Sequence, residues 1–167
     1  RGISNLKDVG DSATEVSKAV QVLVGSGFDS LADSMKIATI ASQGATAGNV
    51  ATATSVKLLT GLMNSYNMKT IPDAIRLNDE MFTIVREGSV EYKDLAANIS
   101  QLLPIFSSVG ISTKEMGAAI IEMSKTSMPM AQIETGLAGL GRQLAAATPE
   151  AKEFAKTLHV DIVDGIF

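Results

Sequence analysis

The sequence contains no cysteine and no tryptophan, and aromatic residues make up only 4% of its 167 residues. The absence of cysteine excludes disulfides, thiolate metal sites and cysteine nucleophiles. With few aromatic side chains, a hydrophobic core has to be built from alanine, leucine, isoleucine, valine and the eight methionines. These small side chains let helices approach closely, and they leave little for stacking on nucleic-acid bases.

Basic runs and long apolar runs are also missing. Lysine and arginine are scattered and the formal net charge is −4, so the basic surface that phosphate binding needs is not indicated. We therefore expect no specific nucleic-acid partner. The longest apolar stretches, such as 19–25 and 117–121, are far shorter than the roughly 20 residues of a membrane span, which argues against a stable span. The first residues, "RGISNLKDVG", show neither an initiator methionine nor the apolar region of a signal peptide, and we expect the chain to be a segment of a longer protein.

Residues for catalysis are equally scarce. His159 is the only histidine, so a histidine pair for a metal and a Ser-His-Asp triad cannot form within the chain. Glu122 is the one carboxylate in an apolar context, where burial could raise its pKa, but a single glutamate on such a helix more often points to solvent. The glycines at 136, 139 and 141 lack the dinucleotide-binding spacing and are interpreted as close helix packing. The sequence thus predicts no catalytic, cofactor-binding or metal-binding residues.

Apolar residues recur with the period of an α-helix, and no convincing alternating strand pattern is present. We predict an all-α fold, a compact bundle of about seven or eight short antiparallel helices joined by short connections. The predicted domain covers residues 12–160, between a lead-in at 1–11 and a tail at 161–167. The predicted helices run approximately over 12–24, 29–43, 46–66, 71–86, 90–110, 112–124, 129–146 and 148–158.

Helix boundaries are predicted from capping residues and glycines. Ser or Thr followed three positions later by Glu predicts a capping box, and proline is tolerated in the first turn of a helix. Pro104 lies inside the fifth predicted helix, where we expect a kink or a break. The predicted caps and stops are Ser12, Glu15, Gly44, Gly110, Ser112, Glu115, Thr148 and Pro149.

The helical spacing of apolar residues also predicts the core, with the sixth helix at the centre of the bundle because it is apolar on nearly every side. The loop around Met128 and Met130 is a candidate contact surface. Gly44 and Gly110, each followed by a capping residue, suggest either two related helical-hairpin halves or two unrelated hairpins that follow the same local rules. The predicted core residues are Leu31, Met35, Leu59, Met63, Leu103, Phe106, Met116, Ala119, Ile120, Met123, Leu137 and Leu140.

The order of these pieces resembles the core region of phage tail tape measure proteins of the TP901 family. The pieces are "GIS" at 110–112, Glu115, "GAAIIEMS" at 117–124, "ETGL" at 134–137 and "ATPEAKEFAKTL" at 147–158. Upstream, "SVEYKDLAANISQLLPIFSSVG" and "PDAIRLNDEMF" also fit. The sequence departs from the family at "TSMPM", where the family often has a glycine, and at "IET", where the family has Ala-Gly-Thr.

The resemblance implies a non-enzymatic structural module of a phage or prophage tail tape measure protein, which contributes to tail assembly and length determination. It implies the virion tail interior as location, with assembly in the host bacterial cytoplasm. The expected partners are other tail proteins, namely tube, tail-tip or initiator components, and a second copy of the chain. The alternatives are a cell-wall lytic module, which would need a carboxylate such as Glu122, and a membrane-active module attached to a tape measure protein.

Overall fold

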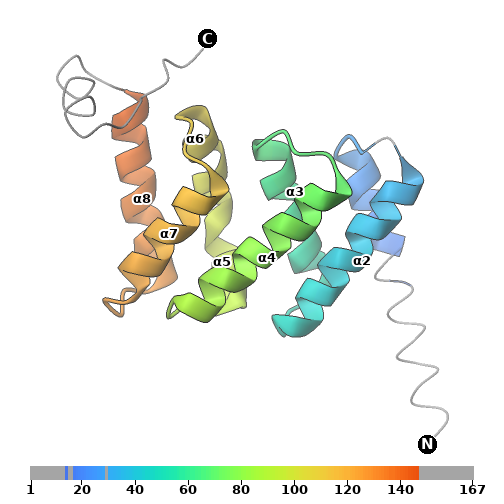
Figure 1. Ribbon diagram of the computed structural model, residues 1–167, viewed down its shortest axis with the longest axis horizontal. Coiled ribbons are helices and arrows are strands. Elements are labelled where there is room, and N and C mark those ends of the chain that lie inside the picture. The colour runs from blue at the N-terminus through green and yellow to red at the C-terminus, as the bar shows by residue number, and fades with distance from the viewer. Residues whose placement is uncertain (1–13, 15–16, 29, 147–167) are drawn as a thin grey trace, which may run out of the picture. The chain divides into compact units, whose positions relative to one another are not determined.

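A computed structural model describes residues 14, 17–28 and 30–146 (Figure 1). The described residues form helices and turns with no strand, which confirms the all-α class. The predicted caps Ser12, Glu15, Thr148 and Pro149 lie outside the described residues, as do His159 and the predicted domain limits at 11 and 160. A helical segment at 17–25 precedes the named elements. These are α2 (Leu31–Ala47), α3 (Thr52–Ser65), α4 (Ile71–Glu87), α5 (Tyr92–Asn98), the 3₁₀ turn η1 (Ile99–Gln101), α6 (Leu102–Ser108), α7 (Thr113–Ser124) and α8 (Met130–Ala145).

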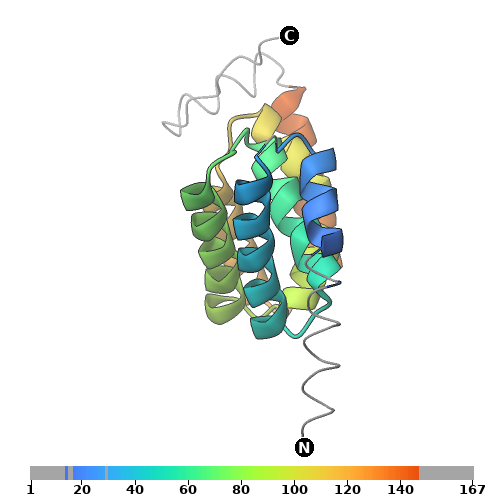
Figure 2. The same cartoon turned by 90° about the vertical axis from the view of Figure 1, so that its right-hand side faces the viewer.

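The chain divides into two compact units, Arg1–Asp79 and Glu80–Phe167, and the division falls inside α4. In the first unit, α2 and α3 form a hairpin, and the helical segment at 17–25 lies beside α3 (Figure 2). The hydroxyl of Ser30 caps α2 by accepting the amide hydrogen of Asp33. Residues such as Leu59 and Met63 of α3 are buried in this unit.

The core prediction is wrong at two positions of α2. The side chains of Leu31 and Met35 are 61% and 53% exposed. The buried stripe of α2 instead follows Ser34, Ile37 and Ala41, and at 100° per residue both exposed side chains project to one side of it. Apart from Ile37, the buried residues of α2 are therefore small, while two large apolar residues face outward.

Gly44 does not end α2 as predicted, since it is buried within the helix, which continues to Ala47. The reversal comes at Asn49, which has a φ of 51°. The same arrangement ends four helices: a residue with positive φ is followed by an apolar residue whose amide donates to the carbonyl five positions earlier. The residues with positive φ are Gly27, Asn49, Asn67 and Gly110. The hydrogen bonds that follow them run from Phe28 to Leu23, from Val50 to Ala45, from Met68 to Met63 and from Ile111 to Phe106.

The proposed relation between two halves is not supported at these boundaries. Gly110 has a φ of 77° and lies in the turn after α6, whereas its supposed counterpart Gly44 is helical. Ser112 caps the start of α7, whereas Thr46 lies near the end of α2. The matching offsets therefore join non-equivalent places in the fold.

In the second unit, α8 packs against α5, α6 and α7. Several predicted core residues are buried in this unit, and three are not fully buried: Ala119 and Met123 are partly exposed and the side chain of Leu140 is 50% exposed. Leu140 lies at the edge of the buried stripe of α8, which passes through Leu137, Ala138 and Gly141. The buried residues are Leu103, Phe106, Met116, Ile120 and Leu137.

The expected break near Pro104 is present. The helix becomes a 3₁₀ turn at Ile99–Gln101, and α6 starts at Leu102. Pro104 is therefore in the first turn of α6, where the amide hydrogen that proline lacks would have no helical partner. The proline separates one predicted helix into two helices of seven residues each.

Glycine permits close packing at two helix contacts of this unit. A Cβ on Gly117 of α7 would lie 3.1 Å from Cδ1 of Ile84, and one on Gly141 of α8 would lie 2.5 Å from Cγ2 of Ile105. A Cβ on Gly139 would contact no atom within 4 Å, so the close-packing interpretation is wrong there. The sixth predicted helix, α7, is also not enclosed on nearly every side, because Lys114, Ala118 and Glu122 are exposed along it.

Candidate functional site

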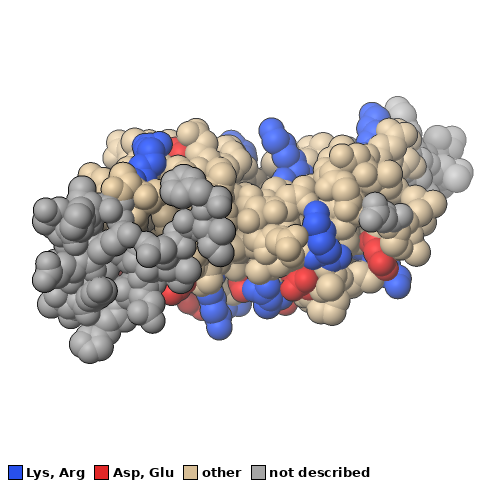
Figure 3. Space-filling view, turned by 90° about the horizontal axis from the view of Figure 1, so that it is seen from above, with Lys and Arg blue, Asp and Glu red and all other residues tan. Residues whose placement is uncertain are grey.

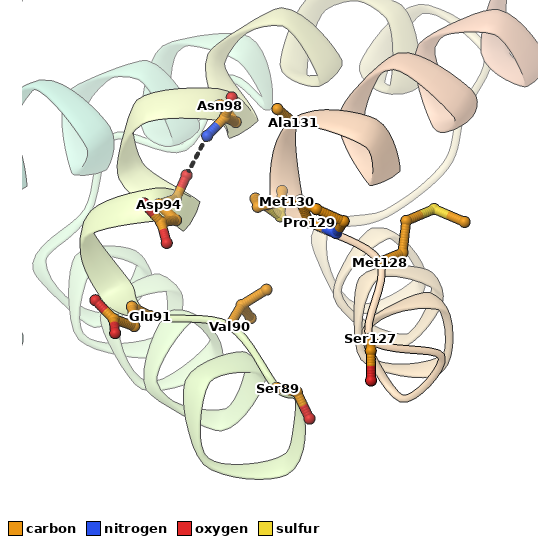
Figure 4. A pocket seen from close by; sticks show the side chains of 10 residues that line it. All are labelled: Ser89, Val90, Glu91, Asp94, Asn98, Ser127, Met128, Pro129, Met130 and Ala131. Carbon is orange, nitrogen blue, oxygen red and sulfur yellow. Dashed lines mark hydrogen bonds between the residues drawn. The ribbon is translucent and has the colours of Figure 1, made fainter.

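A groove between two loops lies on the surface of the second unit (Figure 4). One loop joins α4 to α5, and the other joins α7 to α8. Both loops are short, and each begins at the end of a helix that packs in the same unit. The groove is therefore positioned by helix ends rather than by long irregular segments.

Ser124, the last residue of α7, holds the two loops together. Its buried hydroxyl accepts the amide hydrogen of Ser89 at 3.0 Å and donates to the carbonyl of Ile121 at 2.7 Å. Gly88 allows this approach, because a Cβ there would lie 2.9 Å from the Ser124 hydroxyl and 2.6 Å from the carbonyl oxygen of Ile84. One side chain thus links the end of α4 to the end of α7.

The α5 side of the groove is fixed by an aromatic pair and a helix start. The rings of Phe82 and Tyr92 stack with centroids 5.0 Å apart, which holds the first turn of α5 against α4. The carbonyl of Glu91 accepts the first helical hydrogen bond of α5, from the amide of Leu95. Asn98, one turn later, donates from its side-chain amide to the carbonyl of Asp94 at 2.7 Å (Figure 4).

The opposite side is built by the turn after α7. Ser127 has a φ of 61°, a left-handed conformation that is unfavourable for a residue with a Cβ. This turn lies in "TSMPM", where the resembling family often has glycine. Pro129 then precedes α8 and provides no side-chain cap for its first amides.

The groove has a volume of about 540 Å³, within the range of about 300–1,000 Å³ typical of ligand pockets. Its charged residues, Glu91 and Asp94, are both acidic, and no lysine or arginine lines it. In Figure 4, Val90 points into the space between the two sides, while the side chain of Met128 extends away from Val90. The lining residues are Ser89, Val90, Glu91, Asp94, Asn98, Ser127, Met128, Pro129, Met130 and Ala131.

The structure changes the interpretation of the predicted contact loop. Met128 is partly exposed at the groove, but Met130 is buried, with only 4% of its surface accessible. Met130 therefore belongs to the floor of the groove and to the core rather than to an exposed loop tip. Sequence reasoning missed Glu91 and Asp94 as groove residues and Ser124 as the link between the loops, because nothing in the sequence shows that the two loops meet.

The capping box predicted at the start of α7 is present. The Ser112 hydroxyl accepts the amide hydrogen of Glu115 at 3.2 Å, and the Glu115 carboxylate accepts the amide hydrogen of Ser112 at 2.8 Å. Hydrogen bonds from the Ser112 hydroxyl and amide lower the pKa of Glu115. A second capping box, not predicted, joins Thr70 and Asp73 at the start of α4, and the pKa of Asp73 is lowered chiefly by the Thr70 hydroxyl.

The acidic residue weighed as a catalyst has a different setting. Glu122 is exposed on α7 and forms an ion pair with Lys125, one turn along the same helix. Among the described residues, no group of three or more histidine, cysteine or acidic side chains is arranged to hold a metal ion. Within the same part of the chain, no helix has both the length and the apolar character for crossing a bilayer. In the view of Figure 3, acidic and basic side chains are interspersed among neutral ones.

Comparison with known proteins gives one finding. A model of the family described as phage-related minor tail protein matches residues 4–165 of the chain. No curated protein and no solved structure matches the chain significantly.

Proposed function

The chain belongs to the phage-related minor tail protein family, and we propose that it is a non-enzymatic module of a tail tape measure protein. The family assigns it to the phage tail in a structural role. The match over residues 4–165 is the observation that carries the proposal, because it covers nearly all of the 167 residues. The narrower assignment to tape measure proteins is supported by the resemblance to the TP901 family core region.

In this role the module contributes to tail assembly and to length determination. It resides in the tail interior after assembly in the host cytoplasm, and its partners are tube, tail-tip or initiator components of the tail. The longest described helices have 17 residues, which corresponds to about 26 Å. Tight turns reverse the direction of the chain between helices. A folded module of this kind supports tail assembly by contacting its neighbours, whereas an extended helix contributes length in proportion to its residue number.

The proposal is tested by deleting residues 31–145 in frame from the complete phage gene and measuring tails by electron microscopy. We expect either loss of tail assembly or a changed tail length. If the segment is extended as one helix in the tail, at about 1.5 Å per residue, the tails become about 170 Å shorter. If the segment acts as a folded docking module, tails fail to assemble, and tails shortened in proportion to the deleted residues are not seen.

Supplying the intact gene in trans is the matched control and should restore tails of normal length and number. Tails that are unchanged in both respects after the deletion would contradict the proposed function.

A further inference from the structure

The groove between the α4–α5 and α7–α8 loops combines three features that favour one class of ligand. The first is an apolar floor. Val90 and Met130 are buried there, and the partly exposed Met128 and the exposed Pro129 present apolar surface to a ligand. A hydrated ion gains nothing from such a floor, whereas an aliphatic side chain gains the free energy of burying apolar surface.

The second feature is negative charge on one side. Glu91 and Asp94 line the groove from the start of α5, and both residues are exposed to solvent. With no lysine or arginine among the lining residues, the charge of the groove itself is unbalanced. A lysine or arginine fits both features, because its aliphatic stem covers apolar surface while its cationic head reaches the carboxylates.

The third feature is a set of backbone donors on the other side. The first amides of an α-helix have no partner within the helix, and Pro129 supplies no side-chain cap for α8. The amides of Gln132 and Ile133 already donate to the carbonyl of Pro129. The earlier amides, at Met130 and Ala131, belong to residues that line the groove. The first amides of a helix can donate to main-chain carbonyls of a peptide bound beside them.

We propose that this groove binds an extended peptide segment of a partner protein, with a lysine or arginine beside small apolar residues. The cationic side chain lies over Val90 and pairs with Glu91 and Asp94, and the peptide main chain accepts hydrogen bonds at the start of α8. That the segment comes from another tail component rests on the proposed function. The peptide chemistry rests on the groove alone.

The test is a titration of the isotope-labelled 167-residue chain with a capped peptide, glycine-valine-lysine-valine-lysine-glycine, followed by amide chemical shifts. We expect the largest shifts at the groove residues, with Met130 and Ala131 among them. A second peptide has norleucine at both lysine positions, which keeps the aliphatic stem and removes the charge. We expect it to bind at least threefold more weakly, about the effect of losing exposed ion pairs.

A double variant, Glu91→Gln with Asp94→Asn, should weaken binding of the lysine peptide at least about threefold. The matched control is Glu87→Gln with Glu122→Gln, which removes the same net charge from exposed positions of the same unit outside the groove. The control should change the affinity less than about twofold, because both carboxylates lie outside the groove lining and already pair with Arg86 and Lys125.

The proposal is overturned if no amide shifts occur at millimolar peptide, if the shifts lie outside the groove, or if the norleucine peptide binds equally well. Equal weakening by the control variant also overturns it. If the double variant does not fold, the norleucine comparison still decides, because it uses the unaltered chain. Loss of tail assembly after deletion of residues 31–145, together with absent peptide binding, would separate the tail role from the groove proposal.

Discussion

Two glycines of α8 provide a direct test of the packing described for the second unit. Gly139 and Gly141 both lie inside the helix, two residues apart. A Cβ on Gly139 contacts no atom within 4 Å, whereas one on Gly141 would lie 2.5 Å from Cγ2 of Ile105 and 3.1 Å from Cε1 of Phe106. The two alanine substitutions therefore share the same gain in helix propensity and differ in the steric term.

The helix-propensity gain of replacing glycine by alanine is about 1 kcal/mol at each position. At Gly139 nothing opposes it, so Gly139→Ala is expected to raise the free energy of unfolding by up to about 1 kcal/mol. At Gly141 the new methyl group overpacks the contact with α6, which costs about 1–3 kcal/mol. The γ-methyl group of Ile105 is attached to a branched Cβ and cannot swing away as a long flexible chain could. Gly141→Ala is therefore expected to be less stable than Gly139→Ala by about 1–3 kcal/mol.

The measurement is urea unfolding of both variants and the unaltered chain, followed by circular dichroism at 222 nm. With urea m-values of about 1–3 kcal/mol per molar, the two variants should differ in midpoint by about 1 M. Equal midpoints, or a higher midpoint for Gly141→Ala, would show that α6 and α8 do not approach each other closely at this point.

Four further substitutions test the loops and caps. Ser127→Gly should stabilise the protein by about 1 kcal/mol, because it relieves a left-handed conformation at a residue with a Cβ; a lower thermal midpoint would contradict this. Ser124→Ala should cost about 1–2 kcal/mol and speed hydrogen exchange at the Ser89 amide, which loses its acceptor; unchanged exchange would argue against the link between the loops. Ser112→Ala should cost about 1 kcal/mol in urea unfolding. Because the pKa of Glu115 is lowered on folding, the carboxylate stabilises the protein fully at pH values above the ordinary glutamate pKa of about 4.3, and this stabilisation is lost as the pH falls through the lowered pKa. Glu115→Gln should therefore flatten the dependence of the free energy of unfolding on acid pH. An unchanged dependence would refute this.

Local signals in the sequence predicted the parts of the fold that local physics determines. The capping box of Ser112 and Glu115 and the break before Pro104 involve residues within one turn of each other, so spacing alone is sufficient. The helix ends at Asn49 and Asn67 were also readable, since asparagine tolerates positive φ and an apolar residue follows each. Gly44 alone is a poor signal for the end of α2, because the helix continues through it to Ala47.

Features that depend on packing between helices could not be predicted from spacing. The helical spacing of Met35 with other apolar residues predicts that it lies in the core, but the neighbouring small Ser34 is the buried residue. Gly139 and Gly141 look alike in the sequence, and only the position of α6 distinguishes them. The groove likewise needs the hydrogen bond between Ser89 and Ser124, residues 35 positions apart. A single sequence contains no signal for that pairing.

The turns that end the helices have a consequence for how quickly the chain can recover from being pulled apart. Each is closed by hydrogen bonds between residues three to five positions apart, such as the bond from Ile111 to Phe106. Contacts so close along the chain form on the microsecond timescale of single helices and small loops, without a search for distant partners. A segment stretched by mechanical load would therefore regain its helices and reversals soon after release.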